Sequence, residues 1–128
     1  MSLRLTLTGL VLGLAAQLAL AGEIKPFSQI EFDQMQRAGQ PVLVGVAAGW
    51  CPTCKAQKPV VGQLSQQPAY KDVTVLVIDF DADKAALPQF KATMQSTLIA
   101  FKGSKEVGRS VGDASPAGIE SLFKKVLN

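Results

Sequence analysis

The run PVLVGVAA, residues 41–48, constrains the fold of this chain more than any other part of its sequence. It is continuously apolar and rich in β-branched residues, with Pro41 at its start and Gly49 after its end. Such a run is typical of a strand that is covered on both faces, as in the middle of an α/β sheet. A second run of this kind, VTVLVIDF at residues 73–80, predicts a neighbouring buried strand.

Helix signals surround these two runs. Ser28 and Glu31 form a capping box that predicts a helix over residues 28–39, in which Ile30 and Met35 suit one buried face. Further helices are predicted over residues 55–67 (with a kink at Pro59), 84–93 and 115–128. In the last of these, Ser115 is the expected N-cap, and the apolar stripe consists of Ile119, Leu122, Phe123 and Val126.

The segment 96–112 predicts two strands that are joined by a turn near Gly103, and residues 22–27 add a short first strand. Alternating helices and strands followed by an antiparallel hairpin predict an α/β fold, with a central mixed β-sheet flanked by helices on both faces. The length of residues 22–128 suits a single domain.

The first 21 residues have the layout of a cleaved secretory signal. Arg4 precedes an apolar run over residues 5–20, and Ala19 and Ala21 are the small residues expected before a cleavage site. A membrane anchor is the alternative, although the run falls short of the about 20 apolar residues that a span needs. We therefore expect a signal peptide at 1–21, a domain at 22–128, and a periplasmic or secreted location.

The charge pattern excludes one class of partner. The net charge is +3, and the basic residues alternate with acidic ones instead of forming a stripe. Nucleic acid is therefore not an expected partner. We also expect no cofactor and a monomer.

The stretch AGWCPTCKAQ, residues 48–57, holds both cysteines of the chain, Cys51 and Cys54. They could be a redox couple, half of a metal site or a structural disulfide. A structural disulfide that closes so short a loop adds little stability. Zinc and iron–sulfur sites need four ligands, and the chain has no histidine, although a dimer could pool four thiolates and two sulfurs could hold Cu(I).

A resemblance to a known family narrows these alternatives. PVLVGVAAGWCPTCKAQKPVV resembles the strand, Trp-Cys-x-x-Cys-Lys motif and kinked helix of thioredoxins, with Pro59 at the kink. VLVIDFDAD is similar to the family's third strand, and STLIAFKGSKEVGRSVG to its closing hairpin, with Gly112 at the glycine of the substrate groove. The resemblance implies a thioredoxin-like fold and a thiol–disulfide oxidoreductase that acts on protein thiols and disulfides.

Three positions depart from the family pattern. Ser96 stands where thioredoxins have a cis-proline, Gly45 where they have a buried acid, and Val77 where they have that acid's partner lysine. Because a cis bond before a non-proline residue costs about 2.5–4 kcal/mol, we predict a trans Gln95–Ser96 peptide. Without a buried base, we also expect slow resolution of mixed disulfides.

The expected roles of the cysteines follow from C-x-x-C spacing at a helix N-terminus. There, unpaired N–H groups and the helix dipole favour an anion, which brings cysteine pKa values from about 8.5 down to roughly 3.5–7.5. We predict that Cys51 is the exposed nucleophile and Cys54 the buried resolving thiol.

Further residues are predicted to bind the substrate. Trp50 is expected to be a flat apolar lip for a partner peptide, the alternative being a half-buried core tryptophan. Pro52 and Thr53 adjoin the thiolate, and the Thr53 hydroxyl could donate to Cys51. The Ser96 hydroxyl could do the same, and Gln95 is expected to pair with substrate through its backbone, beside Gly112.

The function expected from all of this is an exported oxidoreductase that reduces protein disulfides or transfers electrons to them, and that is supplied by a membrane electron donor. Electron flow in the opposite direction stays open, because the reduction potential decides it. The alternative function is binding or delivery of a metal, copper or an iron–sulfur cluster, by Cys51 and Cys54.

Overall fold

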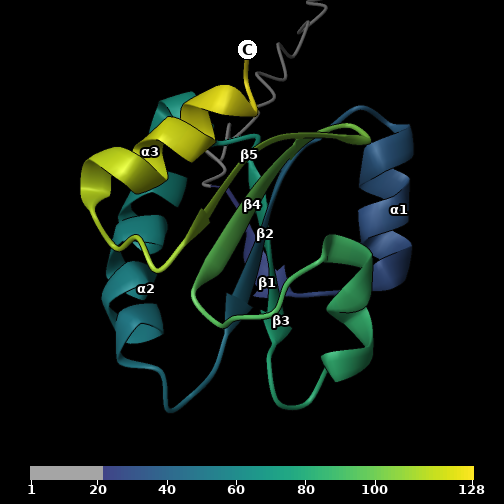
Figure 1. The fold of residues 1–128 in the computed structure, drawn as a ribbon. Helices are drawn as coiled ribbons and strands as arrows, with labels where there is room; N and C mark the ends of the chain where they lie inside the picture. Colours follow the sequence, from purple (N-terminus) through teal and green to yellow (C-terminus); the bar gives the residue numbers. More distant parts are fainter. Residues whose placement is uncertain (1–21) are drawn as a thin grey trace, which may run out of the picture.

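A computed structural model of the protein describes residues 22–128 (Figure 1). Strands, α-helices and short 3-10 helices (η) alternate along this part of the chain. In order they are β1 (Ile24–Pro26), α1 (Gln29–Arg37), β2 (Pro41–Ala47), α2 (Pro52–Ser65), η1 (Pro68–Tyr70), β3 (Thr74–Asp79), η2 (Lys84–Ala86), η3 (Pro88–Phe90), β4 (Thr97–Lys102), β5 (Lys105–Val111) and α3 (Pro116–Lys125). No helix in the described residues is long and apolar enough to cross a membrane.

The five strands form one mixed sheet in the order β1-β3-β2-β4-β5. β3 runs parallel to both β1 and β2, whereas β4 pairs antiparallel with β2 and with β5. β2 is the central strand, and its residues 42–46 are all buried. The mixed sheet, the buried middle strand and the closing hairpin are confirmed.

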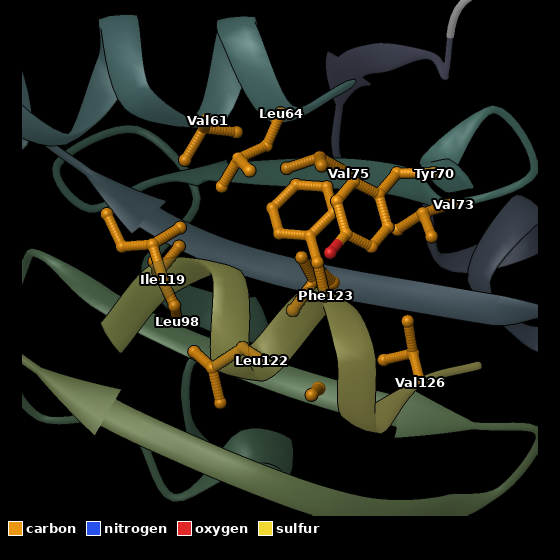
Figure 2. Close-up of a cluster of buried hydrophobic side chains, with 12 residues drawn as sticks. Val61, Leu64, Tyr70, Val73, Val75, Leu98, Ile119, Leu122, Phe123 and Val126 are labelled. Carbon is orange, nitrogen blue, oxygen red and sulfur yellow. The ribbon is translucent and has the colours of Figure 1, made fainter. Parts of the chain in front are cut away.

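Helices cover both faces of the sheet, as Figure 1 shows: α2 and α3 lie on one face, and α1 with the segment of η2 and η3 lies on the other. Each face has its own hydrophobic cluster. The α2–α3 cluster consists of Leu43, Val61, Leu64, Tyr70, Val73, Val75, Leu98, Ala100, Ile119, Leu122, Phe123 and Val126. In Figure 2, Val61 and Leu64 of α2 point toward Phe123 of α3, and the rings of Tyr70 and Phe123 lie side by side.

The phenylalanine cluster, on the other face, is built around the rings of Phe27, Phe32, Phe90 and Phe101. Here one prediction is wrong: Ile30 is 70% exposed, and the buried residue of α1 is Phe32. Met35, three residues after Phe32, packs against the same cluster as predicted. At 100° per residue, Ile30 lies about 200° around the helix from Phe32 and so points to solvent.

The predicted helix over residues 84–93 is also wrong. Two 3-10 turns, η2 and η3, replace it, and Lys91 ends the second in a left-handed conformation with φ 51°. Pro88 explains the break, because proline has no N–H to continue an α-helix and its ring clashes with the preceding turn.

Two predicted helix starts, those capped by Ser28 and Ser115, are confirmed, whereas α2 begins at Pro52 and not at residue 55. The Ser28 hydroxyl accepts a hydrogen bond from the Glu31 amide at 3.3 Å, and the Ser115 hydroxyl accepts one from the Gly118 amide at 3.1 Å. Each hydroxyl satisfies an amide that the first helical turn leaves unpaired. All four predicted stripe residues of α3 are buried in the α2–α3 cluster.

Candidate active site

Cys51 and Cys54 lie where β2 ends and α2 begins. Cys51 is the N-cap of α2, with extended backbone angles, and Pro52 is the first helical residue. The two cysteines form a disulfide with their Cα atoms 5.3 Å apart. The Cys51 Sγ accepts a hydrogen bond from the Cys54 amide at 3.1 Å. A sulfur therefore takes the place that a serine or aspartate oxygen usually has at a helix N-terminus.

Both cysteines are buried in this oxidised state. Cys51 is 2% exposed and Cys54 8%, and they pack with Ala48 against Phe80. The expected exposed position of Cys51 is thus wrong for the disulfide, in which its sulfur is bonded to Cys54 and packed in this small cluster. The roles of nucleophile and resolving thiol stay predictions.

Trp50 stands on the surface beside the disulfide. It is 57% exposed, so the interpretation as a core tryptophan is wrong. Its indole Nε1 donates a hydrogen bond to Asp81 Oδ2 at 2.8 Å, and its ring meets Phe80 edge to face. The Asp79 carboxylate in turn accepts hydrogen bonds from the amides of Asp81 and Ala82. The loop after β3 therefore fixes the orientation of Trp50, a role that the sequence analysis did not find.

Pro52 is exposed, and Thr53 is partly exposed. Within residues 22–128, no hydrogen bond joins the Thr53 hydroxyl to a cysteine sulfur, since the donor to Cys51 is the Cys54 amide. The expected contact of Thr53 with Cys51 is absent from the oxidised structure.

The segment before β4 forms another part of the site. No peptide bond in residues 22–128 is cis, which confirms the trans Gln95–Ser96 bond. Ser96 has φ 57°, a left-handed conformation that is strained for a residue other than glycine. Its hydroxyl donates to the Gln95 carbonyl at 2.6 Å. In the disulfide form the hydroxyl therefore does not donate to Cys51, and the hydrogen bond to a Cys51 thiolate stays a prediction.

Hydrogen bonds hold Ser96 next to the ends of two other strands. The Ser96 amide donates to the Val46 carbonyl of β2 at 2.7 Å, and the Gly112 amide, just after β5, donates to the Ser96 carbonyl at 3.0 Å. Gly112 has φ 76°, which explains why a glycine is needed there. The end of β2, the start of β4 and the end of β5 therefore meet at the edge of the sheet where α2 begins (Figure 1).

Gln57 connects α2 to the same segment. It is 5% exposed, and its Nε2 donates to the Ser96 carbonyl at 3.1 Å and to the Asp113 carbonyl at 2.9 Å. The sequence analysis missed it, although a signal was present. Gln57 precedes the buried Val61 and Leu64 by four and seven residues, so it is a polar residue on the buried face of α2.

A groove of about 780 Å³ runs between α2 and the sheet, and Cys54, Gly45 and Val77 are among the residues that line it. A Cβ at Gly45 would meet its nearest neighbour, Leu98 Cδ2, at 3.4 Å, which is ordinary packing distance. The buried polar residues of the described chain are Gln57, Ser65, Ser96 and Thr97. None of them is a carboxylate, so no buried acid lies beside Cys54 in residues 22–128.

The electrostatics of the site come mainly from backbone groups. Cys51 is at the positive end of the α2 dipole and accepts an amide hydrogen bond there. On the neighbouring loop, hydrogen bonds from the Ser115 side chain and amide lower the pKa of Asp113. Among residues 22–128, no three His, Cys, Asp or Glu side chains gather closely enough to hold a metal ion. The arrangement suits thiol–disulfide exchange, because a sulfur at this position is stabilised as an anion.

Comparisons with known proteins agree with this geometry. The family model described as Thioredoxin matches residues 23–125. A thioredoxin of Chlamydia muridarum is 40% identical over 84 residues, which are 66% of this chain and 80% of the relative. Thioredoxin X of Arabidopsis thaliana chloroplasts is 34% identical over 110 residues, 84% of this chain and 60% of the relative.

Solved structures give the same result. The crystal structure of Trxlp from Edwardsiella tarda is 44% identical and superimposes with a TM-score of 0.76, covering 79% of this chain and 98% of that one. The Nicotiana alata thioredoxin NaTrxh is 29% identical with a TM-score of 0.71, covering 82% and 94%. The chain therefore belongs to the thioredoxin family, and with its Cys51–Cys54 disulfide it is a thiol–disulfide oxidoreductase.

Proposed function

We propose that this protein is exported, that it acts as a monomer in the periplasm or outside the cell, and that it reduces disulfide bonds of other proteins. The observation that carries the proposal is the Cys51–Cys54 disulfide at the N-terminus of α2. Gln95, whose backbone we expect to pair with that of a partner, directly precedes Ser96 at the same edge of the sheet. The layout of residues 1–21, which lie outside the described structure, supports export.

The reaction has two exchange steps. The Cys51 thiolate attacks one sulfur of a protein disulfide; a bond forms between the two sulfurs, and the other substrate sulfur leaves as a thiolate. The Cys54 thiolate then attacks Cys51 Sγ, which restores the Cys51–Cys54 bond and releases the second substrate sulfur. The substrate gains two electrons and the protein loses two. A dithiol carrier in the membrane would return the protein to the reduced form.

Each group near the pair has a defined part in this scheme. The Cys54 amide, 3.1 Å from Cys51 Sγ, stabilises the attacking thiolate, and the exposed Trp50 offers an apolar surface next to it. Cys54 must lose its own proton to resolve the mixed disulfide. Because no buried carboxylate lies beside it in the described residues, and Asp79 and Asp83 of the same groove are exposed, we expect water or the partner's leaving thiolate to take that proton.

Single-cysteine variants test the exchange steps. Reduced Cys54→Ser should form a stable mixed disulfide with a protein such as insulin, whereas Cys51→Ser should form none. The wild-type protein should reduce insulin in repeated cycles when dithiothreitol is supplied. If the Cys51→Ser variant formed the stable mixed disulfide through Cys54, and Cys54→Ser formed none, the assigned roles would be wrong.

The direction of electron flow is tested by the reduction potential of the Cys51–Cys54 couple. A value near −270 mV, as in thioredoxin, would support reduction of substrates, and a value near −120 mV would support their oxidation. Mass spectrometry of the protein from a periplasmic fraction tests export: the N-terminus should be Gly22. A full-length N-terminus in the cytoplasm would contradict the proposed location.

Metal delivery is not supported as a second function. In the described part of the chain, no three His, Cys, Asp or Glu side chains lie close enough together to hold a metal ion, and both cysteines are bonded to each other. A purified reduced protein that carries stoichiometric copper or an iron–sulfur cluster would overturn this conclusion.

A further inference from the structure

Gln57 is a buried polar side chain that the exchange chemistry does not use. Its neighbours along the buried face of α2, Val61 and Leu64, are apolar, and an amide buried among them needs hydrogen-bond partners. Gln57 Nε2 has two N–H groups, and the two carbonyls that it reaches, those of Ser96 and Asp113, use both. These carbonyls belong to the segment before β4 and to the loop after β5.

Ser96 needs support of this kind. A left-handed serine persists only where its surroundings hold it, and Ser96 has φ 57°. Its amide is held by the Val46 carbonyl and its carbonyl by the Gly112 amide, both through backbone bonds between strand ends. Gln57 adds the only one of these contacts that comes from a side chain of α2, the helix that carries Cys54.

The neighbouring residue Gln95 is partly exposed at this edge. Its carbonyl accepts the Ser96 hydroxyl, which leaves a second lone pair, and its amide donates to no acceptor within residues 22–128. These main-chain groups are able to pair with an extended peptide, in the manner of an added strand. Their position relative to the disulfide is set through Ser96.

We propose that Gln57 is a positioning residue for the substrate: it ties the Gln95–Ser96 segment and the Asp113 loop to α2, so that the backbone of Gln95 lies at a fixed distance from the cysteines. The proposal rests on the proposed function, since it assumes that a partner's backbone binds at Gln95. Gln57 touches neither sulfur in this scheme, and it acts only through the carbonyls of Ser96 and Asp113.

The test uses Gln57→Met, which keeps the length of the side chain and removes both donors, and Gln57→Asn, which is too short to reach both carbonyls. The matched control is Gln63→Met, on the exposed side of the same helix, where the side chain makes no hydrogen bond within residues 22–128. Gln57→Asn also keeps the test decisive if Gln57→Met does not fold.

Three measurements separate positioning from a general structural role. We expect Gln57→Met to raise the KM for insulin at least about tenfold with kcat changed less than twofold, and to raise amide exchange at Gly112 by a similar factor. Alkylation of reduced Cys51 by iodoacetamide should change less than twofold, and amide exchange at Ile99, within β4, should not change. Gln57→Asn should show a smaller effect of the same pattern, and Gln63→Met none.

Two results would overturn the proposal: an unchanged KM and unchanged Gly112 exchange in both Gln57 variants, or a loss of Cys51 alkylation in parallel with the rise in KM. The failure of the proposed function looks different. If the wild-type protein alkylates normally but does not reduce insulin, that function is wrong. The positioning role of Gln57 is then decided by amide exchange alone, with an unchanged rate at Gly112 counting against it.

Discussion

The two faces of the central sheet are packed in different ways. The α2–α3 cluster is mostly aliphatic, with one aromatic pair, Tyr70 and Phe123, whose ring centroids lie 5.2 Å apart. In the phenylalanine cluster four rings contact one another, with centroid distances of 5.1–5.9 Å. Four of these five ring pairs are edge to face. The groove of about 780 Å³ next to Cys54 is lined by Val61, Val75 and Leu98 of the α2–α3 cluster, whereas a smaller hollow of about 390 Å³ lies beside Phe27 and Ala86 on the other face.

The two faces contribute differently: one orders irregular segments of the chain, and the other carries the reactive cysteines. The phenylalanine cluster holds segments with little regular structure of their own, η2 and η3, so its rings must supply the order there. The other face of the sheet is covered by the regular helices α2 and α3. Gly45 has no side chain and therefore leaves space in the groove that Cys54 also lines. The protein therefore combines a face packed around aromatic rings with one that has the larger groove, next to the reactive pair.

The largest effect is expected from removing a central ring. Phe32 is 3% exposed and meets the rings of Phe27, Phe90 and Phe101, so Phe32→Ala should lower the free energy of unfolding by about 3–5 kcal/mol. Urea denaturation measures the loss. The control Ile30→Ala, at an exposed site of the same helix, should change it by less than about 0.5 kcal/mol. A loss below about 1 kcal/mol for Phe32→Ala would show that the rings do not order this face.

Arg109 tests how the irregular segment of the same face is attached. Its guanidinium donates to the Phe90 carbonyl at 2.6 Å and to the Lys91 carbonyl at 3.4 Å. Because these are charge-assisted hydrogen bonds to the end of η3, Arg109→Met should lower the free energy of unfolding by about 1–3 kcal/mol.

Two controls accompany the Arg109 variant. Lys105→Met removes an exposed charge from the same strand, and Glu106→Gln removes only the exposed ion pair with Arg109. Each should change the free energy of unfolding by less than about 1 kcal/mol. If Glu106→Gln were as damaging as Arg109→Met, the ion pair and not the two carbonyls would explain the effect.

A substitution at Gly45 tests the role of the groove next to Cys54. Gly45→Asp places a carboxylate in the groove that Cys54 also lines, and this base should speed the decay of a mixed disulfide on Cys51 at least about tenfold at neutral pH. Stopped-flow fluorescence of Trp50 follows the decay. Gly45→Asn has the same shape and no base, and should leave the rate near that of the wild type. Equal rates for the two variants would refute the missing-base explanation.

The smallest effect is expected at Tyr70, in the α2–α3 cluster. Burial, and then the hydrogen bond that its hydroxyl donates to Glu120 at 2.8 Å, raise the pKa of Tyr70 above its ordinary value of 10.0. The folded state thus favours the protonated phenol. This contribution to stability is fully present below pH 10 and is lost as the pH rises through the folded-state pKa.

The difference in unfolding free energy between wild type and Tyr70→Phe, measured from pH 8 to 11, isolates this contribution, because lysines titrate equally in both proteins. We expect the advantage of the wild type to shrink above pH 10. A constant difference over this range would mean that the buried hydroxyl does not titrate with folding.

What the sequence predicts well in this protein is local. Ser28 and Ser115 mark helix starts by their own hydrogen bonds, and the apolar run of β2 needs no distant partner to be read as a buried strand. Pro88 was an equally local signal against a continuous helix over residues 84–93, and the prediction did not use it.

What the sequence did not predict depends on contacts between distant segments. The burial of Cys51 reflects its bond to Cys54 and their packing against Phe80, which comes from another strand end. The hydroxyl of Ser96 bonds to the adjacent Gln95 carbonyl because of a left-handed backbone that the residue type does not favour. Gln57 was visible as a polar residue on an apolar helix face, yet its partners lie 39 and 56 residues away.

The hydrogen bond between the Cys54 amide and Cys51 Sγ has a practical consequence. This bond is strongest to the thiolate, which carries a negative charge, and the neutral sulfur of the disulfide, the thiol and a mixed disulfide differs in the atom bonded to it. The chemical shift of the Cys54 amide proton should therefore differ among these four states. One backbone resonance would then follow each stage of the reaction in solution, without a dye or an added label.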